Sequence, residues 1–287
     1  MATRKTKVTA PISEPQLTTA LTRGIRLLQC FSTADQELSS KDLSERTGLA
    51  RPTVFRLTTT LCELGLLRYS ESRMMFSPTP RLLTLGAPVL ASMKARHLAR
   101  PMMQQLAEVS DAQVLLSAGS QYEVIVVEAA MGSKAEVFRP EIGTRLSLSH
   151  TAIGRAHLLG LSVQERQRYI RQISATDAAR AKALETKLKE DEEQLRRKGF
   201  ITARREARPD VAGAAVPMRS QIDDQTFIFS CSVLPFNVDD VQLDAIGARL
   251  ASLVHSVEAS FGNLGDFSAS HGEVFESQAP PRRRAAK

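Results

Sequence analysis

Residues 39–69 read SSKDLSERTGLARPTVFRLTTTLCELGLLRY and decide the fold of the N-terminal part of the chain. Ser39 and Asp42 have the spacing of a capping box, in which a hydroxyl and an acidic residue satisfy the free N–H groups of a first helical turn. Gly48 stands where the chain must leave this helix in a left-handed conformation. Pro52 falls in the first turn of the next helix, where its missing N–H costs nothing. The pattern predicts two short helices joined by a tight turn.

The second of these helices has an apolar side that predicts its packing. The apolar positions that recur at helical spacing are Val54, Leu57, Leu61 and Leu64. Gly65 ends the helix. Arg51 lies at the helix N-terminus, and Thr53, Arg56 and Thr60 lie one step round from the apolar side, where they can approach base edges of a duplex. The segment therefore predicts a DNA-binding helix-turn-helix.

A small hairpin is predicted directly after this helix. Residues 66–69 and 74–76 are largely apolar and flank the polar turn 70–73, which is typical of a two-stranded wing and brings Arg73 near a phosphate. An ordinary helical hairpin with a solvated charged face is the alternative to a DNA-binding module. The complete set of predicted DNA contacts is Ser40, Arg51, Pro52, Thr53, Phe55, Arg56, Thr60 and Arg73.

The distribution of charge supports DNA binding. Of the 38 Lys and Arg residues, 14 lie in residues 1–98, against 7 of the 31 Asp and Glu residues, which leaves 24 of each for the rest. The net charge of +7 therefore lies in the first third of the chain, as phosphate neutralisation requires. Part of the excess is Arg4, Lys5 and Lys7, in a basic arm predicted to be disordered, which follows the DNA backbone or merely aids solubility.

Length and composition limit the classes of protein to which the rest of the chain can belong. The 287 residues, 43% hydrophobic and 24% charged, predict two globular domains. No apolar run reaches the length of a membrane span and the N-terminus lacks the apolar core of a secretory signal, so we expect a cytoplasmic protein without a membrane partner. Cys30, Cys62 and Cys231 are few and far apart, which favours buried thiols over disulfides or a zinc site.

An α+β domain is predicted beyond a linker helix at residues 80–98. Leu82, Leu85, Val89 and Met93 share one face of that helix, which pairs with a second copy of the chain or packs on its own chain. Further on, strands are predicted around 114–116, 124–127, 214–216 and 226–229, and helices at 177–198 and 238–261. The side of the last helix predicted to face the sheet comprises Val241, Ile246, Leu250, Leu253 and Val257.

These observations divide the chain into five parts. They are a disordered basic arm at 1–16, a winged helix-turn-helix domain at 17–79, the linker and dimerisation helix at 80–98, a second domain at 99–262, and a disordered tail at 263–287.

Several motifs occur together and in order from about Leu17 to Gly262. In the N-terminal part they are Arg23-Gly24-Ile25-x-Leu27-Leu28, Leu43-Ser44-x-Arg46-Thr47-Gly48-Leu49, Arg51-x-Thr53-Val54-x-Arg56-Leu57, Leu64-Gly65-x-Leu67 and Pro80-Arg81-Leu82-Leu83-x-Leu85-Gly86. In the C-terminal part they are Gly143-Thr144-Arg145-Leu146, the run from Leu148 to Ala156, Gly199-Phe200 and Val211-x-Gly213-Ala214-Ala215-Val216-Pro217. In this order and spacing they resemble the IclR family of bacterial transcriptional regulators.

The resemblance implies a DNA-binding winged helix and a C-terminal domain, similar to GAF and PAS sensors and built on an antiparallel sheet, that binds a small effector and alters operator binding. It also implies a homodimer or a dimer of dimers on a palindromic operator. The effector residues implied are Ser149, His150, Thr151, Asp210, Gly213, Cys231 and Val233, the last two on a strand of Ser-x-Ser type.

This chain departs from the family pattern within the implied pocket. Ser149 stands in place of a histidine, Gly213 in place of a cysteine and Val233 in place of the second serine, while residues 203–206 replace an acidic run and bring Arg204 and Arg205 near the pocket. Helix N-terminal N–H groups with a hydroxyl nearby suit a carboxylate. We therefore expect an organic acid, and one that is large or aromatic.

An enzymatic reading finds no support in the motifs. The sequence has no nucleophile elbow, nucleotide-binding glycine loop, HExxH helix or CxxC pair. His150 and His157 are seven residues apart but lack a third metal ligand. We therefore predict no catalytic residue, cofactor or metal, and the alternative is a sensor or enzyme domain that carries an incidental helical module.

Overall fold

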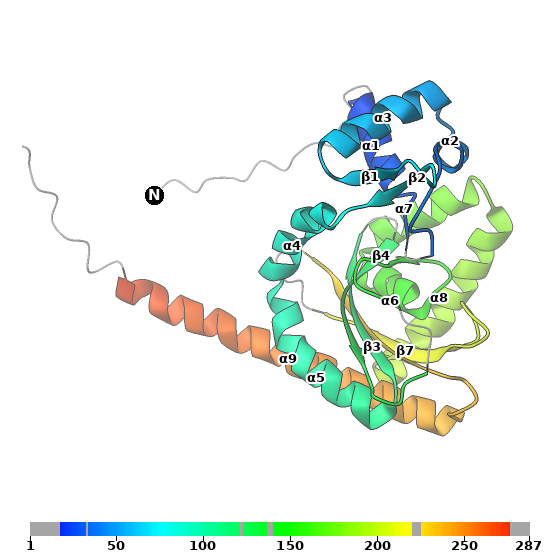
Figure 1. The fold of residues 1–287 in the computed structure, drawn as a ribbon. Helices are drawn as coiled ribbons and strands as arrows, with labels where there is room; N and C mark the ends of the chain where they lie inside the picture. Colours follow the sequence, from blue (N-terminus) through cyan, green and yellow to red (C-terminus); the bar gives the residue numbers. More distant parts are fainter. Residues whose placement is uncertain (1–17, 33, 121–122, 137–139, 220–224, 276–287) are drawn as a thin grey trace, which may run out of the picture. The chain divides into compact units, whose positions relative to one another are not determined.

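A computed structural model describes residues 18–275 apart from 33, 121–122, 137–139 and 220–224, with side chains as far as residue 261. The chain forms two compact units, divided between Ser92 and Met93 (Figure 1). The predicted basic arm and residues 276–287 of the predicted tail lie outside the described residues. Among the helices that the structure describes, none has the length and hydropathy to cross a membrane.

The first unit is a winged helix-turn-helix, as predicted. Two strands, β1 and β2, pair antiparallel and form the wing, with Leu67 opposite Pro78. In chain order the elements are α1 (Thr19–Leu28), α2 (Ser40–Thr47), α3 (Arg51–Glu63), β1 (Leu67–Ser70), β2 (Met75–Pro78), a 3₁₀ helix (Pro80–Leu82) and α4 (Leu83–Ser92).

The capping chemistry predicted for the helix-turn-helix is confirmed. The Asp42 N–H donates to the Ser39 hydroxyl at 3.2 Å, and the Ser39 N–H donates to the Asp42 carboxylate at 2.8 Å. Gly48 ends α2 with φ 69°, a conformation that other residues adopt only with strain. Pro52 lies in the first turn of α3. These local interactions fix the angle at which the chain enters α3.

One side of α3 packs into the core of the first unit. Val54, Thr58 and Leu61 are buried there. The prediction that Leu64 is buried is wrong, because α3 ends at Glu63 and Leu64 is 53% exposed. The apolar side chains of this core are Leu27, Leu38, Leu43, Val54, Leu61, Leu67 and Phe76.

The linker is not the single helix predicted for residues 80–98. Helix α4 ends at Ser92, and Met93 is extended, with φ −75° and ψ 94°, before α5 (Lys94–Ser110) begins. Arg96, in the first turn of α5, forms a 2.7 Å ion pair with buried Glu128. This ion pair joins the start of α5 to β4, and the break between α4 and α5 coincides with the boundary between the two units. No residue of α4 is buried.

A six-stranded antiparallel sheet forms the centre of the second unit. Its order is β5-β4-β3-β8-β7-β6. The short edge strands β5 and β6 were not predicted. The strands are β3 (Gln113–Gly119), β4 (Glu123–Met131), β5 (Arg145–Ser147), β6 (Ile201–Arg204), β7 (Ala212–Pro217) and β8 (Phe227–Val233). The helices after α5 are α6 (Ala152–Gly160), α7 (Val163–Ser174), α8 (Ala178–Lys198) and α9 (Asp240–Phe275).

Helices cover both faces of this sheet. Helices α5 and α9 lie on one face, and α6 and α8 on the other (Figure 1). Successive side chains of a strand point to opposite faces, so β8 contributes to both layers. Ile228 packs with Ile153 of α6 and Leu188 of α8 in a single apolar cluster. The predicted α+β class is therefore confirmed.

Three details of the prediction are wrong. Val241, at the start of α9, is 79% exposed, whereas the other four residues predicted to face the sheet are buried. Helix α9 continues to Phe275, where a tail without secondary structure was predicted from residue 263. Of the three cysteines, only Cys231 is fully buried, and Cys30 and Cys62 are partly exposed.

Because Val54 is fully buried in α3, we expect Val54→Asp to unfold the first unit. An unpaired carboxylate in this core costs about 4 kcal/mol or more. Hydrogen exchange of the amides in residues 40–78 should lose its protection, while Thr59→Asp, on the exposed side of the same helix, should keep it. Equal protection in the two variants would contradict the assigned packing.

Candidate functional site

The outer side of α3 presents two arginines without competing partners. Arg51, Phe55 and Arg56 are exposed, and Thr53 is half-buried. Within the described residues, neither guanidinium makes a hydrogen bond or an ion pair to a side chain. The Thr60 hydroxyl donates to the Arg56 carbonyl at 3.0 Å. The predicted contacts Pro52 and Thr60 are also exposed, and Ser40, in the first turn of α2, is half-buried.

The wing arginine has a partner in its own unit. The Arg73 guanidinium forms a 2.6 Å ion pair with Glu37, in the segment before α2. The pair is partly exposed, so it is worth little in water and can exchange for a phosphate. Arg68 of β1 donates to the Ser77 hydroxyl at 2.8 Å and holds the two wing strands together.

An apolar groove lies beside α3 in the first unit. It has a volume of about 880 Å³ and is lined by α1, by α3 with Thr53, Arg56 and Thr60 among its residues, by Leu64 and Leu66, and by Leu85 of α4. Phe55, predicted as a DNA contact, lines this groove and is 66% exposed. The other exposed apolar side chains here are Leu21 and Ile25 of α1, Leu64 directly after α3, and Leu83, Leu85 and Val89 of α4.

The second unit contains a cavity between its sheet and the start of α6. Its volume is about 290 Å³, the lower end of the range for small-molecule pockets. Most of the wall is apolar, and its polar side chains are His150, Thr151, Glu206, Arg208, Ser230 and Ser232. The apolar wall comprises Leu115, Pro140, Leu146, Ala152, Ile153, Ala203, Ala207, Val211, Gly213 and Ala214.

Three of the seven predicted effector residues line this cavity, namely His150, Thr151 and Gly213. Cys231 and Val233 do not, because they point to the opposite face of β8, where both are buried. Burial raises the pKa of the Cys231 thiol to about 12. The serines that face the cavity are Ser230 and Ser232, so the Ser-x-Ser pattern lies one residue earlier than we predicted. Because side chains alternate between the two faces of a strand, the two-residue spacing of Ser230 and Ser232 was the sequence signal that both face the same side.

The other predicted positions point elsewhere. Ser149 accepts a hydrogen bond from Arg180 of α8 at 2.7 Å, and Asp210 accepts two from Arg208. Arg204 donates to the carbonyls of Pro235 and Val238, before α9, and the Arg205 guanidinium lies 5.4 Å from the Phe236 ring centroid. Neither arginine lines the cavity, so our prediction for them is wrong. The arginine that lines the cavity is Arg208.

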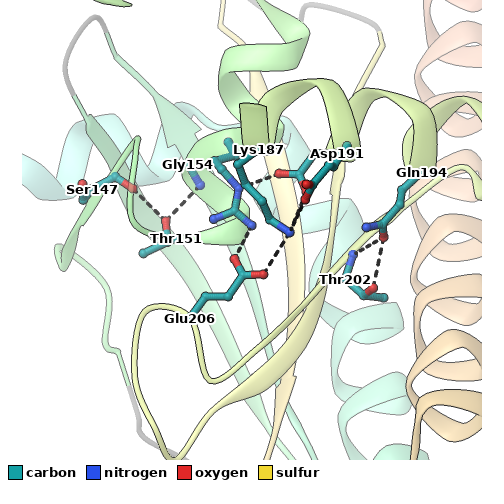
Figure 2. Close-up of polar contacts among 10 residues, drawn as sticks. Ser147, Thr151, Gly154, Lys187, Asp191, Gln194, Thr202 and Glu206 are labelled. Carbon is teal, nitrogen blue, oxygen red and sulfur yellow. Dashed lines mark hydrogen bonds and ion pairs between the residues drawn. The ribbon is translucent and has the colours of Figure 1, made fainter. Parts of the chain in front are cut away.

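The N-terminus of α6 opens onto the cavity. The Thr151 hydroxyl accepts from the Gly154 N–H at 3.0 Å and donates to the Ser147 carbonyl at 2.8 Å, as Figure 2 shows. The hydroxyl thus acts as donor and acceptor in the helix cap. A side chain at Gly154 would overlap the Ser147 carbonyl oxygen, so glycine permits this close turn. Ala152 and Ile153, whose N–H groups have no intrahelical partner, line the cavity.

A buried ion-pair network supports the wall on the side of Glu206 (Figure 2). Arg155 of α6 is 3% exposed and contacts Asp191 at 2.5 Å and Glu206 at 2.6 Å. Lys187 contacts Glu206 at 3.2 Å. Burial lowers the pKa of Lys187, but the hydrogen bond and charge of Glu206 and the charge of Asp191 outweigh it and hold that pKa above its ordinary value. The network fixes the Glu206 carboxylate at the cavity wall.

His157 of α6 lies outside this cavity and is buried. One ring nitrogen, Nε2, is 3.1 Å from the Ser120 carbonyl oxygen. The ring fills the space beside Gly119, where a Cβ atom would overlap it. Burial lowers the pKa of His157 and so favours the neutral ring. In the part of the chain that the structure describes, no group of three His, Cys, Asp or Glu side chains is arranged to hold a metal ion.

Comparisons with known families match both units. The IclR helix-turn-helix domain matches residues 20–71, and the C-terminal domain of the bacterial transcriptional regulator IclR matches residues 87–258. The HTH-type transcriptional regulator TsaQ1/TsaQ2 of Comamonas testosteroni is 28% identical over 244 residues, which are 84% of this chain and 87% of the relative.

Solved structures share the fold. An IclR family transcriptional regulator from Brucella abortus is 28% identical, with a TM-score of 0.74 over 86% of this chain and 94% of that one. An IclR homologue from Microbacterium hydrocarbonoxydans, complexed with 4-hydroxybenzoate, is 19% identical, with a TM-score of 0.64 over 84% of this chain and 100% of that one. At that identity the likeness concerns the fold alone.

The depressed pKa of His157 predicts a loss of stability in acid. The unfolded chain binds a proton as the pH falls below the ordinary value of 6.5, whereas the buried ring stays neutral. Protons then favour the unfolded state, so the free energy of unfolding of the second unit decreases as the pH falls through this range.

We expect His157→Gln to reduce the difference in melting temperature between about pH 7.5 and about pH 5.5. His255→Gln, at an exposed histidine of α9, should keep the difference seen in the unaltered protein. Scanning calorimetry measures it, and identical pH dependence in the two variants would count against a buried neutral ring.

Proposed function

The chain belongs to the IclR family of transcriptional regulators and carries the family's DNA-binding helix-turn-helix, and on this premise we propose its partners. It binds a palindromic operator through α3 and the wing, as a homodimer or a dimer of dimers. A small organic acid, bound in the cavity of the second unit, changes the affinity for that operator. Its relatives are transcriptional regulators rather than enzymes.

The free arginines of α3 are the observation that carries the operator proposal. Arg51 and Arg56 project from a helix whose other side is held in the core, and they have no partner within the described residues. Arginine is the side chain most often used to read guanine in the major groove and also neutralises phosphate. The turn before α3 and the wing then contact the backbone on either side.

The exposed apolar side of α4 supports self-association. Leu83, Leu85 and Val89 are exposed and no residue of α4 is buried, which is more apolar surface than an isolated DNA-binding unit needs. A second copy of the chain covers such a surface and places two α3 helices in related orientations, as a palindromic site requires. Phe55 lines the groove beside α3 together with Thr53 and Arg56, and stays with them on the side proposed to face DNA.

The cavity suits a monoanionic, largely apolar ligand. The N–H groups at the start of α6 and the positive end of its dipole attract a carboxylate. Arg208 lies at the cavity, and its partly exposed pair with Asp210 can exchange. The remaining wall is mostly apolar. The structural neighbour complexed with 4-hydroxybenzoate supports an aromatic acid.

The operator proposal predicts that Arg56→Ala lowers DNA affinity about tenfold. The slope of log affinity against log salt should fall by about one, because one cationic contact is removed. Fluorescence anisotropy with a duplex covering the region upstream of the gene measures both. Arg196→Ala, on an exposed arginine of α8 paired with Glu193, is the control and should change neither. Unchanged binding by Arg56→Ala would remove α3 from the interface.

The effector proposal predicts that benzoate raises the melting temperature of the protein, whereas benzamide and benzamidine, with the same ring, do not. At about 100 times its dissociation constant a ligand stabilises by about 2.7 kcal/mol. Thermal-shift measurements on the full chain test this. Stabilisation by the amide or the amidine alone would rule out a carboxylate effector.

A further inference from the structure

Phe55 is a large apolar side chain in the middle of the outer side of α3. It is 66% exposed, and it is not among the described side chains that form or pack against the core of the first unit. Residues four apart lie in one row on a helix, and Arg51, Phe55 and Thr59 form such a row. All three are exposed. Phe55 therefore lies one turn after the arginine at the helix N-terminus.

The helix directs the Phe55 ring toward its own N-terminal end. In α-helices, aromatic side chains lean back over the preceding turn, because the third rotamer would collide with that turn. The preceding turn of α3 carries Arg51 and Pro52. The N-terminal residues of a recognition helix are those that contact base edges in the major groove. The Phe55 ring is thus placed to reach a base edge when α3 enters the groove.

A phenyl ring can read only one feature of a base edge. It has no hydrogen-bond donor or acceptor, whereas the base edges of the major groove present donors and acceptors that lose water when an apolar group covers them. The exception is the C5-methyl group of thymine, which projects into the major groove and contacts apolar side chains. Packing the ring against this methyl group removes apolar surface from water on both sides. Phe55 therefore suits thymine among the four unmodified bases.

The neighbours of Phe55 on α3 complement this contact. Arg51 and Arg56 are exposed, and within the described residues neither guanidinium makes a hydrogen bond or an ion pair to a side chain. A guanidinium pairs with guanine or with phosphate and does not recognise a methyl group. Thr53 and Arg56 line the groove beside α3 together with Phe55. The exposed side of α3 thus combines two cationic groups with one aromatic ring.

We propose that Phe55 selects thymine in the operator, by packing its ring against the C5-methyl group of one thymine in each half-site. The proposal rests on the operator-binding function proposed above. Arg51 and Arg56 supply most of the affinity through their charge, and Phe55 supplies a preference that depends on the base sequence. A second copy of the chain is the other partner that can cover an exposed ring. Replacing thymine by uracil, which lacks the methyl group, separates the two, because only a contact with DNA depends on that group.

Fluorescence anisotropy of the full chain with two duplexes tests this. Both duplexes cover the region upstream of the gene, and the second carries deoxyuridine in place of every thymidine, so that only the methyl groups are removed. The unaltered protein should bind the thymine duplex about tenfold tighter, as expected when two methyl groups are buried. Phe55→Ala should bring this ratio to about one, mainly by weakening the binding of the thymine duplex.

Two variants serve as controls. Arg56→Ala should weaken the binding of both duplexes and keep the tenfold ratio, because it removes a charge and no methyl contact. Phe236→Ala alters a phenylalanine of the second unit that is 70% exposed. This variant should leave both affinities, and so their ratio, as in the unaltered protein.

The outcomes separate thymine selection from operator binding. If Phe55→Ala keeps the tenfold ratio, Phe55 does not read thymine, even where the variant binds both duplexes more weakly through a lost contact with a second copy. A ratio of about one in the unaltered protein also overturns the selection, while operator binding stands. If the unaltered protein binds neither duplex, operator binding fails and the selection of thymine fails with it.

Discussion

The burial of one side of α3 is the constraint on which the rest of the first unit depends. Val54 and Leu61 pack against Leu27 and Leu43, so the helix cannot rotate about its axis without exposing them. The opposite side, with Arg51 and Arg56, is then fixed toward solvent and carries no internal partner within the described residues. The capping box of α2 and the glycine turn set the direction of α3. The side chains proposed to face DNA are thus positioned by an apolar contact on the opposite side of the helix.

In the second unit, the alternation of side chains along each strand determines which residues face the cavity, as the burial of α3 determines which residues face solvent in the first unit. On β8, one set of side chains packs under α5 and α9, and the other set, with Ser230 and Ser232, forms the cavity floor. A shift of one residue would exchange serines for Cys231 and Val233 and remove the polar floor. The other walls are fixed by contacts that are not themselves available to a ligand. Thr151 is used as a cap, and Arg155 with Lys187 holds Glu206 in place (Figure 2).

Local chemistry made much of this fold predictable from sequence. Ser39, Asp42, Gly48 and Pro52 act within one turn of themselves, so their spacing alone indicates α2, the turn and α3. Features that depend on contacts between residues far apart in the sequence were harder to predict. The break at Met93 falls at the boundary between the two units, and Arg204 points toward Pro235 because two carbonyls before α9 accept its hydrogen bonds. The resemblance to the family located the strand that lines the cavity, β8. Only the register of the sheet shows that Ser230 and Ser232, and not Cys231 and Val233, face the cavity.

The central claim is that acid in the cavity and DNA on α3 bind to one thermodynamically coupled protein, and linkage tests it most directly. Anisotropy gives the affinity for the upstream duplex with and without 4-hydroxybenzoate, and calorimetry gives the affinity for the acid with and without duplex. We predict that the acid changes DNA affinity about fivefold or more, and that DNA changes acid affinity by the same factor. If the acid and the duplex both bind measurably, but neither ligand changes the affinity for the other, the account is contradicted.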